Sequence, residues 1–170
     1  MNFTMSWNEW YVVLMATVST SFFLIIRKHF PFSARILIWI FTVNFVELFD
    51  YAIAATPFQL YYCGDNTSYE ISTGVLQCFI YPPYAFVFLY FYDKWNIRGT
   101  KLLYYIIGWT LFSVLFEWTF VLSGVFNYIS WKLYYSVPIY PVSHLLLLAL
   151  YRFIQKHLHT PMPSNGSPAG

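Results

Sequence analysis

Apolar residues along this chain form five long runs, separated by shorter segments that hold most of the charged residues. The runs cover residues 7–26, 36–55, 75–92, 102–122 and 137–154. An α-helix of about 18 to 21 residues, rising 1.5 Å per residue, crosses a hydrocarbon layer roughly 30 Å thick. The alternating pattern of a membrane-barrel strand is absent, and a segment in lipid must pair its own backbone groups. The pattern therefore predicts an all-α, polytopic transmembrane bundle of five helices.

Composition also supports a membrane domain and indicates what the chain contacts. Charged residues make up 9% of the chain and apolar residues 59%, whereas a soluble domain has about 25% charged residues. The lipid bilayer is therefore the expected partner, and a formal charge of +2 gives no reason to expect nucleic acid. We predict one membrane domain over residues 1–159. The uncharged, Pro-, Ser- and Gly-rich residues 160–170 predict a disordered cytoplasmic tail.

Basic residues predict the orientation of the bundle. Eight of the nine Lys and Arg residues fall between runs one and two, between runs three and four, or at the end of run five. Lys132, between runs four and five, is the exception. Since positively charged loops stay in the cytoplasm, we expect a multi-pass protein of the cell membrane with its N-terminus outside and its C-terminus cytoplasmic.

Several polar residues lie inside the apolar runs, where a charge costs at least about 2.5 kcal/mol. Asn44, Glu47 and Asp50 follow one another at intervals of three in the second run, Glu117 lies in the fourth and His144 in the fifth. Asp50, Glu117 and His144 are all roughly 8 to 10 Å below the predicted outer boundary. We therefore expect these five side chains to meet as ligand-binding or ion-binding candidates.

Four interpretations of this cluster stay open. Protonated carboxyl groups and the Asn44 amide could hold helices together by hydrogen bonds. Neighbouring carboxyl groups could form a proton or cation relay, because they cannot all ionise in a low dielectric. The cluster could also line an outward-opening pocket for a small ligand or a lipid headgroup. A metal site made of Glu47, Asp50, Glu117 and His144 is the fourth, but one histidine among scattered acids is weak support, and we assign no metal.

The third run contains Tyr81-Pro82-Pro83-Tyr84. Proline lacks a backbone N–H and disfavours helix at the residue before it, so we expect a kink at Pro82 and Pro83. The kink could serve as a gate or a binding bend. It could equally be a tolerated break whose freed carbonyl groups are paired by neighbouring helices.

Cys63 and Cys78 both fall on the predicted outer side of the membrane, which permits disulfides. A bridge between them would close a loop of about 15 residues and add roughly 3 kcal/mol to the stability in the chain-entropy account. The alternative is two unpaired thiols.

The sequence lacks the common catalytic motifs of soluble enzymes. There is no nucleophile elbow, phosphate-binding loop, HExxH helix or CxxC pair. We therefore expect no enzymatic activity and no cofactor. An intramembrane enzyme built from Ser143, His144 and the acids is the third hypothesis, behind solute handling and a scaffold role.

Short motifs are spread over the second half of the chain: Tyr92-Asp93, Gly99-Thr100-Lys101, Glu117-Trp118, Tyr128, Trp131, Tyr135-Ser136 and Tyr151-Arg152-Phe153. In these motifs this half resembles an uncharacterised family of small multi-pass membrane proteins from spore-forming Firmicutes. The resemblance implies a bacterial inner membrane and draws attention to Glu117, but it implies no activity.

The sequence thus predicts an integral membrane protein whose polar intramembrane cluster handles an ion, a proton or a small ligand. The alternative is a non-catalytic structural protein, in which the same groups only join helices or fasten a membrane protein partner or a second copy of the chain.

Overall fold

A computed structural model of the chain describes residues 6–54, 58–65 and 71–158. The long helices are α1 (Trp7–Ile26), α2 (Phe32–Ile53), α5 (Thr100–Leu122) and α6 (Ile139–Leu158), and the third apolar run forms the shorter helices α3 (Ile71–Phe79) and α4 (Tyr81–Lys94). In the described part of the chain, five helical segments are long and apolar enough to cross a membrane. The prediction of an all-α bundle with five spans is therefore confirmed, whereas the predicted tail over residues 160–170 lies outside the described residues.

Two helices begin earlier than the apolar runs suggest. Pro31 is the residue before the first turn of α2, where its fixed φ suits the start of a helix and its missing N–H has no intrahelical partner to lose. Gly99 precedes α5 with a φ of 57°, a left-handed conformation that glycine adopts without strain.

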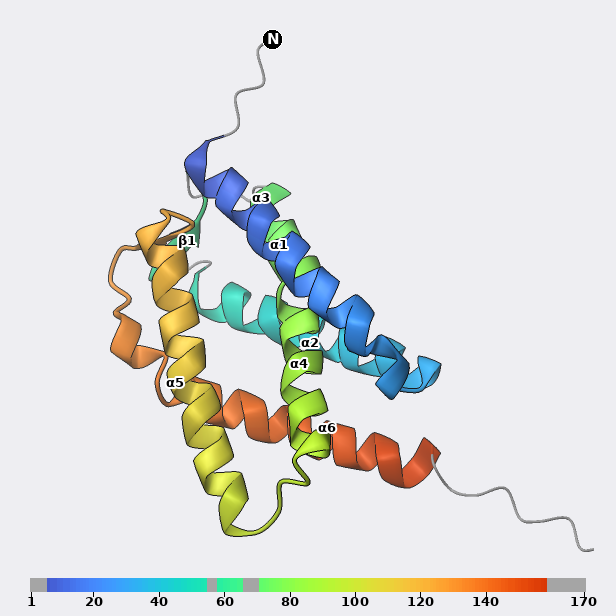
Figure 1. Cartoon of the computed structure of the whole chain (residues 1–170). Helices are drawn as coiled ribbons and strands as arrows, with labels where there is room; N and C mark the ends of the chain where they lie inside the picture. The colour runs from blue at the N-terminus through green and yellow to red at the C-terminus, as the bar shows by residue number, and fades with distance from the viewer. Residues whose placement is uncertain (1–5, 55–57, 66–70, 159–170) are drawn as a thin grey trace, which may run out of the picture.

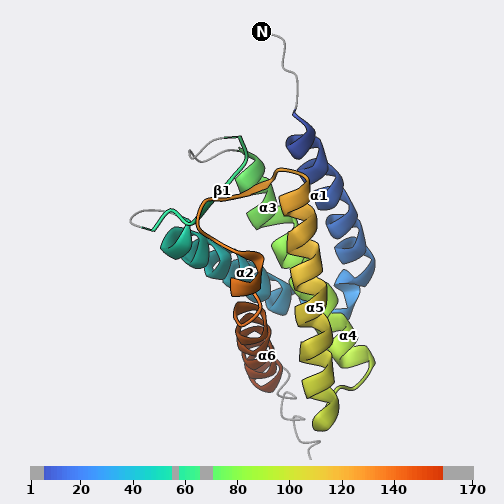
Figure 2. The ribbon, with the colours of Figure 1, turned by 90° about the vertical axis from the view of Figure 1, so that its left-hand side faces the viewer.

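The helices form two groups that cross each other. α4 lies in the centre, where it contacts α1, α2, α3 and α6, and α5 packs against α6. Figures 1 and 2 show α2 and α6 on one side of α1 and α4, running across the direction of α5. Because α4 is covered on several sides, Phe86, Phe88 and Leu89 are fully buried there.

The outward surfaces of the helices are apolar. Ile25 is 76% exposed, Leu122 68% and Leu48 65%, although each belongs to a helix interior or its last turns. Large contiguous apolar surfaces are rare on soluble monomers. This distribution fits helices whose outer faces contact lipid, as in an integral membrane protein.

Two short strands join distant links of the chain. β1 (Tyr61–Cys63), after α2, pairs antiparallel with β2 (Phe126–Tyr128), after α5, so that Tyr61 lies opposite Tyr128. The Asn127 side chain adds a hydrogen bond of 2.8 Å to the carbonyl oxygen of Gly64. Short 3-10 turns, η1 (Arg27–His29) and η2 (Leu133–Tyr135), complete the links.

Candidate functional site

A cavity of about 200 Å³ lies between α2, α4, α5, α6 and the two strands. Its lining is largely aromatic and aliphatic, with a few polar groups that come from separate elements. The polar and aromatic residues of the lining include Phe45, Phe49, Asp50, Tyr61, Tyr81, Tyr84, Glu117, Tyr128, Trp131, Ser136, Tyr140, Ser143 and His144. The cavity therefore brings together three of the residues that the sequence singled out: Asp50, Glu117 and His144.

Glu117, in α5, is 8% exposed and accepts three hydrogen bonds. Its Oε1 accepts from the hydroxyl groups of Tyr128 and, at 2.8 Å, Ser136, while Oε2 accepts from the Tyr140 hydroxyl at 2.7 Å. The Trp131 indole N–H in turn donates to Ser136 Oγ at 3.1 Å. The carboxyl group thus ties α5 to β2, to the link that follows it and to α6.

Asp50, near the end of α2, is half-buried and also lines the cavity. Its Oδ1 accepts a hydrogen bond from the Tyr61 hydroxyl, and its Oδ2 accepts one from Gln77 Nε2 at 3.2 Å. These donors belong to β1 and α3. Asp50 therefore fastens the end of α2 to the two elements that follow it.

The strand pairing places two phenols over two carboxyl groups. Tyr61 and Tyr128 are direct cross-strand partners, and each donates to one acid, Asp50 or Glu117. Burial, followed by the neighbouring Asp50 carboxyl, raises the pKa of Tyr61 well above its ordinary value. Burial, followed by the Glu117 carboxyl, likewise raises the pKa of Tyr128. Both phenols therefore keep their protons and remain donors.

His144, in α6, is 4% exposed and lies flat against Phe88, with ring centroids 4.7 Å apart. The Tyr84 and Tyr140 rings also lie beside it. Its Nδ1 atom is buried and has no hydrogen-bond partner among the described residues. Buried polar groups are nearly always paired, so His144, a residue of the cavity lining, has an unused hydrogen-bonding position.

Asn44 and Glu47 do not join this site. Both side chains are exposed on α2, outside the cavity lining, and Asn44 Nδ2 donates to the Ile40 carbonyl of its own helix at 2.7 Å. Residues three apart on a helix differ by about 60° in direction, so two such steps turn Asp50 roughly 120° from Asn44. Equal spacing therefore brought these residues to neighbouring faces, of which only the Asp50 face meets the cavity.

Pro82 and Pro83 lie in the first turn of α4, and the interruption between α3 and α4 falls at Ile80. In an unbroken helix the backbone N–H of residue 83 would donate to the Phe79 carbonyl oxygen, but proline has no N–H. That carbonyl oxygen instead accepts a hydrogen bond from Thr20 Oγ1 of α1 at 3.4 Å. Tyr81 and Tyr84, on either side of the prolines, both line the cavity. The break thus turns two phenols toward the site while a neighbouring helix pairs a freed carbonyl.

Cys63 and Cys78 do not form the disulfide in the structure, and both side chains are half-buried. Cys63 is held in β1 opposite Phe126.

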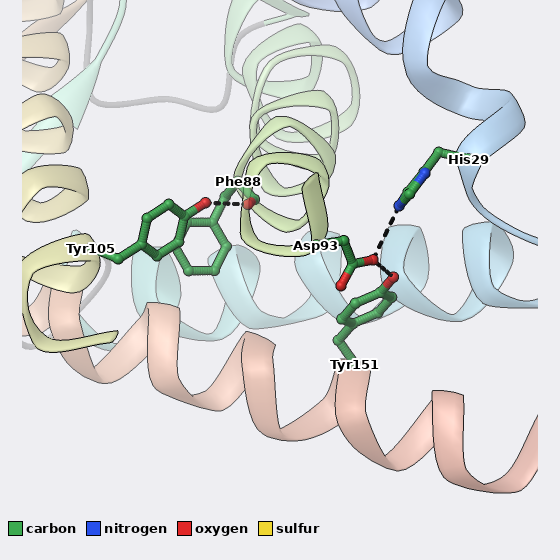
Figure 3. A network of polar contacts seen from close by, with 5 residues as sticks. All are labelled: His29, Phe88, Asp93, Tyr105 and Tyr151. Carbon is green, nitrogen blue, oxygen red and sulfur yellow. Dashed lines mark hydrogen bonds and ion pairs between the residues drawn. The ribbon is translucent and has the colours of Figure 1, made fainter. Parts of the chain in front are cut away.

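A second polar network lies at the other end of α4 (Figure 3). Asp93 Oδ2 accepts a hydrogen bond from the Tyr151 hydroxyl and lies 3.1 Å from His29 Nε2. Beside it, Arg152 Nη2 donates to the Tyr92 hydroxyl at 2.6 Å. These contacts join the α1–α2 link, α4 and α6, so the network closes the end of the bundle opposite the strands.

Eight of the fourteen motif residues quoted from the second half of the chain belong to these two networks. Glu117, Tyr128 and Ser136 meet at the cavity, whereas Asp93 and Tyr151 meet at the far end. Some motif residues that are far apart in the sequence therefore meet in space in this chain.

An apolar groove of about 880 Å³ runs along α1, α4 and α5. Tyr84 lines both this groove and the cavity, so its ring lies between the two spaces. Its hydroxyl is 2.6 Å from Ser113 Oγ in α5, which holds the ring in place.

Sequence reasoning missed most of the hydroxyl groups in the site. Neither Tyr61 nor Trp131 was among the predicted site residues, yet both line the cavity. Tyr140 could have been found, because it lies one helical turn before His144 and shares its face. Tyr128 entered only as a motif residue of the resemblance, with no role assigned, because its place in the site depends on a pairing between distant strands.

Comparison with family models, with characterised proteins and with solved structures finds no match to this chain.

Proposed function

We propose that this integral membrane protein holds a small ligand, an ion or a proton in the cavity lined by Asp50, Glu117 and His144, without catalysing a reaction. The observation that carries the proposal is the unpartnered, buried Nδ1 atom of His144 at the cavity wall. A buried polar atom left without a partner costs about 1 to 3 kcal/mol. A ligand that supplies the missing hydrogen bond would remove that cost.

A structural role is the second candidate function, and the Glu117 contacts favour it. Three hydroxyl groups from separate segments already converge on this carboxyl group. Such interhelical hydrogen bonds contribute about 0.6 to 2 kcal/mol each in membranes. In this alternative the site only joins helices, or fastens a membrane protein partner or a second copy.

The two candidates differ in whether the cavity must be open. Ser143→Phe fills the cavity from α6, whereas Val142→Phe, one residue earlier, places the same ring at a position that is 52% exposed. Native mass spectrometry of protein purified from its own membranes would look for a bound small-molecule mass. We expect that mass with the parent and Val142→Phe and its loss with Ser143→Phe. The same spectrum for all three would overturn ligand binding in this cavity.

The placement in a cell membrane, with the N-terminus outside, is part of the proposal. It is supported by the segregation of the basic residues: eight of the nine Lys and Arg residues lie in the α1–α2 and α4–α5 links, in the adjoining first or last turns of the helices, or in the second half of α6. The resemblance to membrane proteins of spore-forming Firmicutes favours a bacterial inner membrane.

A further inference from the structure

The cavity wall has acidic groups without a basic counterpart. Asp50 and Glu117 line it, and no Lys or Arg does so among the described residues. Every hydrogen bond to the two carboxyl groups comes from a hydroxyl or an amide N–H donor. All the donors around these two groups are neutral, so none of them supplies a positive charge. A cation is the complement that this wall lacks.

Aromatic rings form most of the remaining wall. Tyr81, Tyr84, Trp131, Tyr140 and Phe45 all line the cavity with Asp50 and Glu117. The face of an aromatic ring attracts cations, most strongly where water is excluded, and this attraction is used to recognise ammonium groups. A strongly hydrated metal ion would require oxygen ligands in place of these rings.

The spacing of the polar groups also favours an organic molecule over a single ion. Among the described residues, no three His, Cys, Asp or Glu side chains are close enough together to hold a metal ion. The cavity has about 200 Å³, compared with about 30 Å³ for one water molecule in the liquid. Asp50, Glu117 and His144 are therefore placed to contact different parts of one molecule of several heavy atoms.

His144 is an independent indication of a polar ligand. Its Nδ1 atom is buried without a partner, while its ring packs against Phe88 and lines the cavity. A ligand that carried only an ammonium group would satisfy the acids, and one with a hydroxyl or N–H group as well would also satisfy this nitrogen.

We infer that the cavity binds a small organic cation, an ammonium compound that also carries a hydrogen-bonding group. This inference rests on the proposed function, because it names the class of ligand for the same cavity. The ammonium group contacts the aromatic rings and the carboxyl groups, and the second polar group reaches His144.

Choline and its neutral carbon isostere, dimethylbutanol with a quaternary carbon in place of the nitrogen, form a matched pair of probes. Both have the same shape and the same hydroxyl group, so they differ in charge alone. Isothermal titration of the purified protein in lipid nanodiscs would measure both dissociation constants. We expect choline to bind at least tenfold more tightly than the isostere.

Variants tie this difference to the site. Asp50→Asn and Glu117→Gln each remove one charge, and we expect either to reduce the preference for choline at least tenfold. Glu47→Gln removes a charge from the exposed face of α2 and should leave the preference unchanged. If Glu117→Gln fails to fold, Asp50→Asn still tests the inference, because it breaks a separate set of contacts.

The outcomes test separately whether the ligand is a cation and whether the cavity binds a ligand at all. Equal binding of choline and its isostere, lost in Ser143→Phe, would overturn the cationic class and leave the proposed function standing. Absence of choline binding would also overturn the cationic class. The proposed function would fail with it only if the cavity-filling variant also left the native mass spectrum unchanged.

Discussion

At the scale of single residues, Glu117 and His144 occupy one cavity but differ in what they contact. The Glu117 carboxyl is surrounded by three donors, whereas His144 Nδ1 has no partner among the described residues. The stability of the bundle should therefore depend on the acid and not on that nitrogen.

Glu117→Gln should lower the free energy of unfolding by about 1 to 2 kcal/mol, because the new NH₂ group faces hydroxyl groups that now donate. Chemical unfolding in detergent micelles would measure the change. Glu47→Gln is the control and should stay within about 0.5 kcal/mol of the parent, since that side chain is exposed. Equal losses in the two variants would contradict the role of the Glu117 contacts.

His144→Phe should fold at least as stably as the parent. The phenyl ring keeps the stacking against Phe88 and removes a buried polar atom without a partner, so the free energy of unfolding should stay the same or rise by about 1 kcal/mol. The same unfolding assay measures it. A loss comparable to that of Glu117→Gln would mean that the imidazole holds the helices together.

At the scale of elements, the β1–β2 pair connects the two acidic residues of the cavity, Asp50 and Glu117. Tyr61 and Tyr128 face each other across the strands, and each donates to a different helix, α2 or α5. Because these two hydroxyl groups share one two-stranded unit, their contributions to stability should be coupled.

The two phenols of the β1–β2 pair predict that the stability of the protein depends on pH. The pKa of each phenol is raised in the folded protein above the ordinary value of 10.0. Their stabilisation is therefore complete below about pH 10, where unfolded tyrosines are protonated, and is lost as the pH rises toward the folded-state pKa. The unfolding free energy of the parent should fall above pH 10, and that of the double variant Tyr61→Phe, Tyr128→Phe should fall less steeply. Parallel pH profiles would contradict this.

The break between α3 and α4 should depend on the prolines. Replacing Pro82 and Pro83 by Ala restores two N–H donors, so the two helices should join and straighten. Spin labels at Val75, in the middle of α3, and at exposed Trp95, directly after α4, would report a longer separation by electron paramagnetic resonance. Pro141→Ala, in the first turn of α6, is the control and should leave this distance unchanged.

How far the sequence predicts these elements depends on how local each one is. The spans follow from runs of apolar residues, and counting along each run placed Asp50, Glu117 and His144 at one depth. The facing direction of Glu47 did not follow, because a three-residue step drifts around the helix. The Tyr61–Tyr128 pairing could not be predicted, since it joins short strands separated by three helices.

At the scale of the whole molecule, the charged links define two ends. Lys94, Arg98 and Lys101 lie in or beside the α4–α5 link, and Arg152 and Lys156 lie in the second half of α6. The link that holds β2 carries Lys132 as its one basic residue. The positive ends should remain in the cytoplasm.

This orientation predicts which positions an impermeant thiol reagent can reach in intact cells. In a variant without Cys63 and Cys78, a cysteine in place of exposed Lys132 should be labelled, and one in place of exposed Thr100 should not. Labelling of the Thr100 position in sealed cells would reverse the proposed topology. Labelling of both after lysis is the control for accessibility.

One ring stands between the interior of the bundle and the hydrocarbon phase. Tyr84 borders both the polar cavity and the apolar groove of α1, α4 and α5, and Ser113 keeps it there through one hydroxyl contact. Rotation of that single side chain would connect the groove laterally with the cavity. An amphiphile dissolved among acyl tails would then reach the acids without ever passing through the aqueous phase.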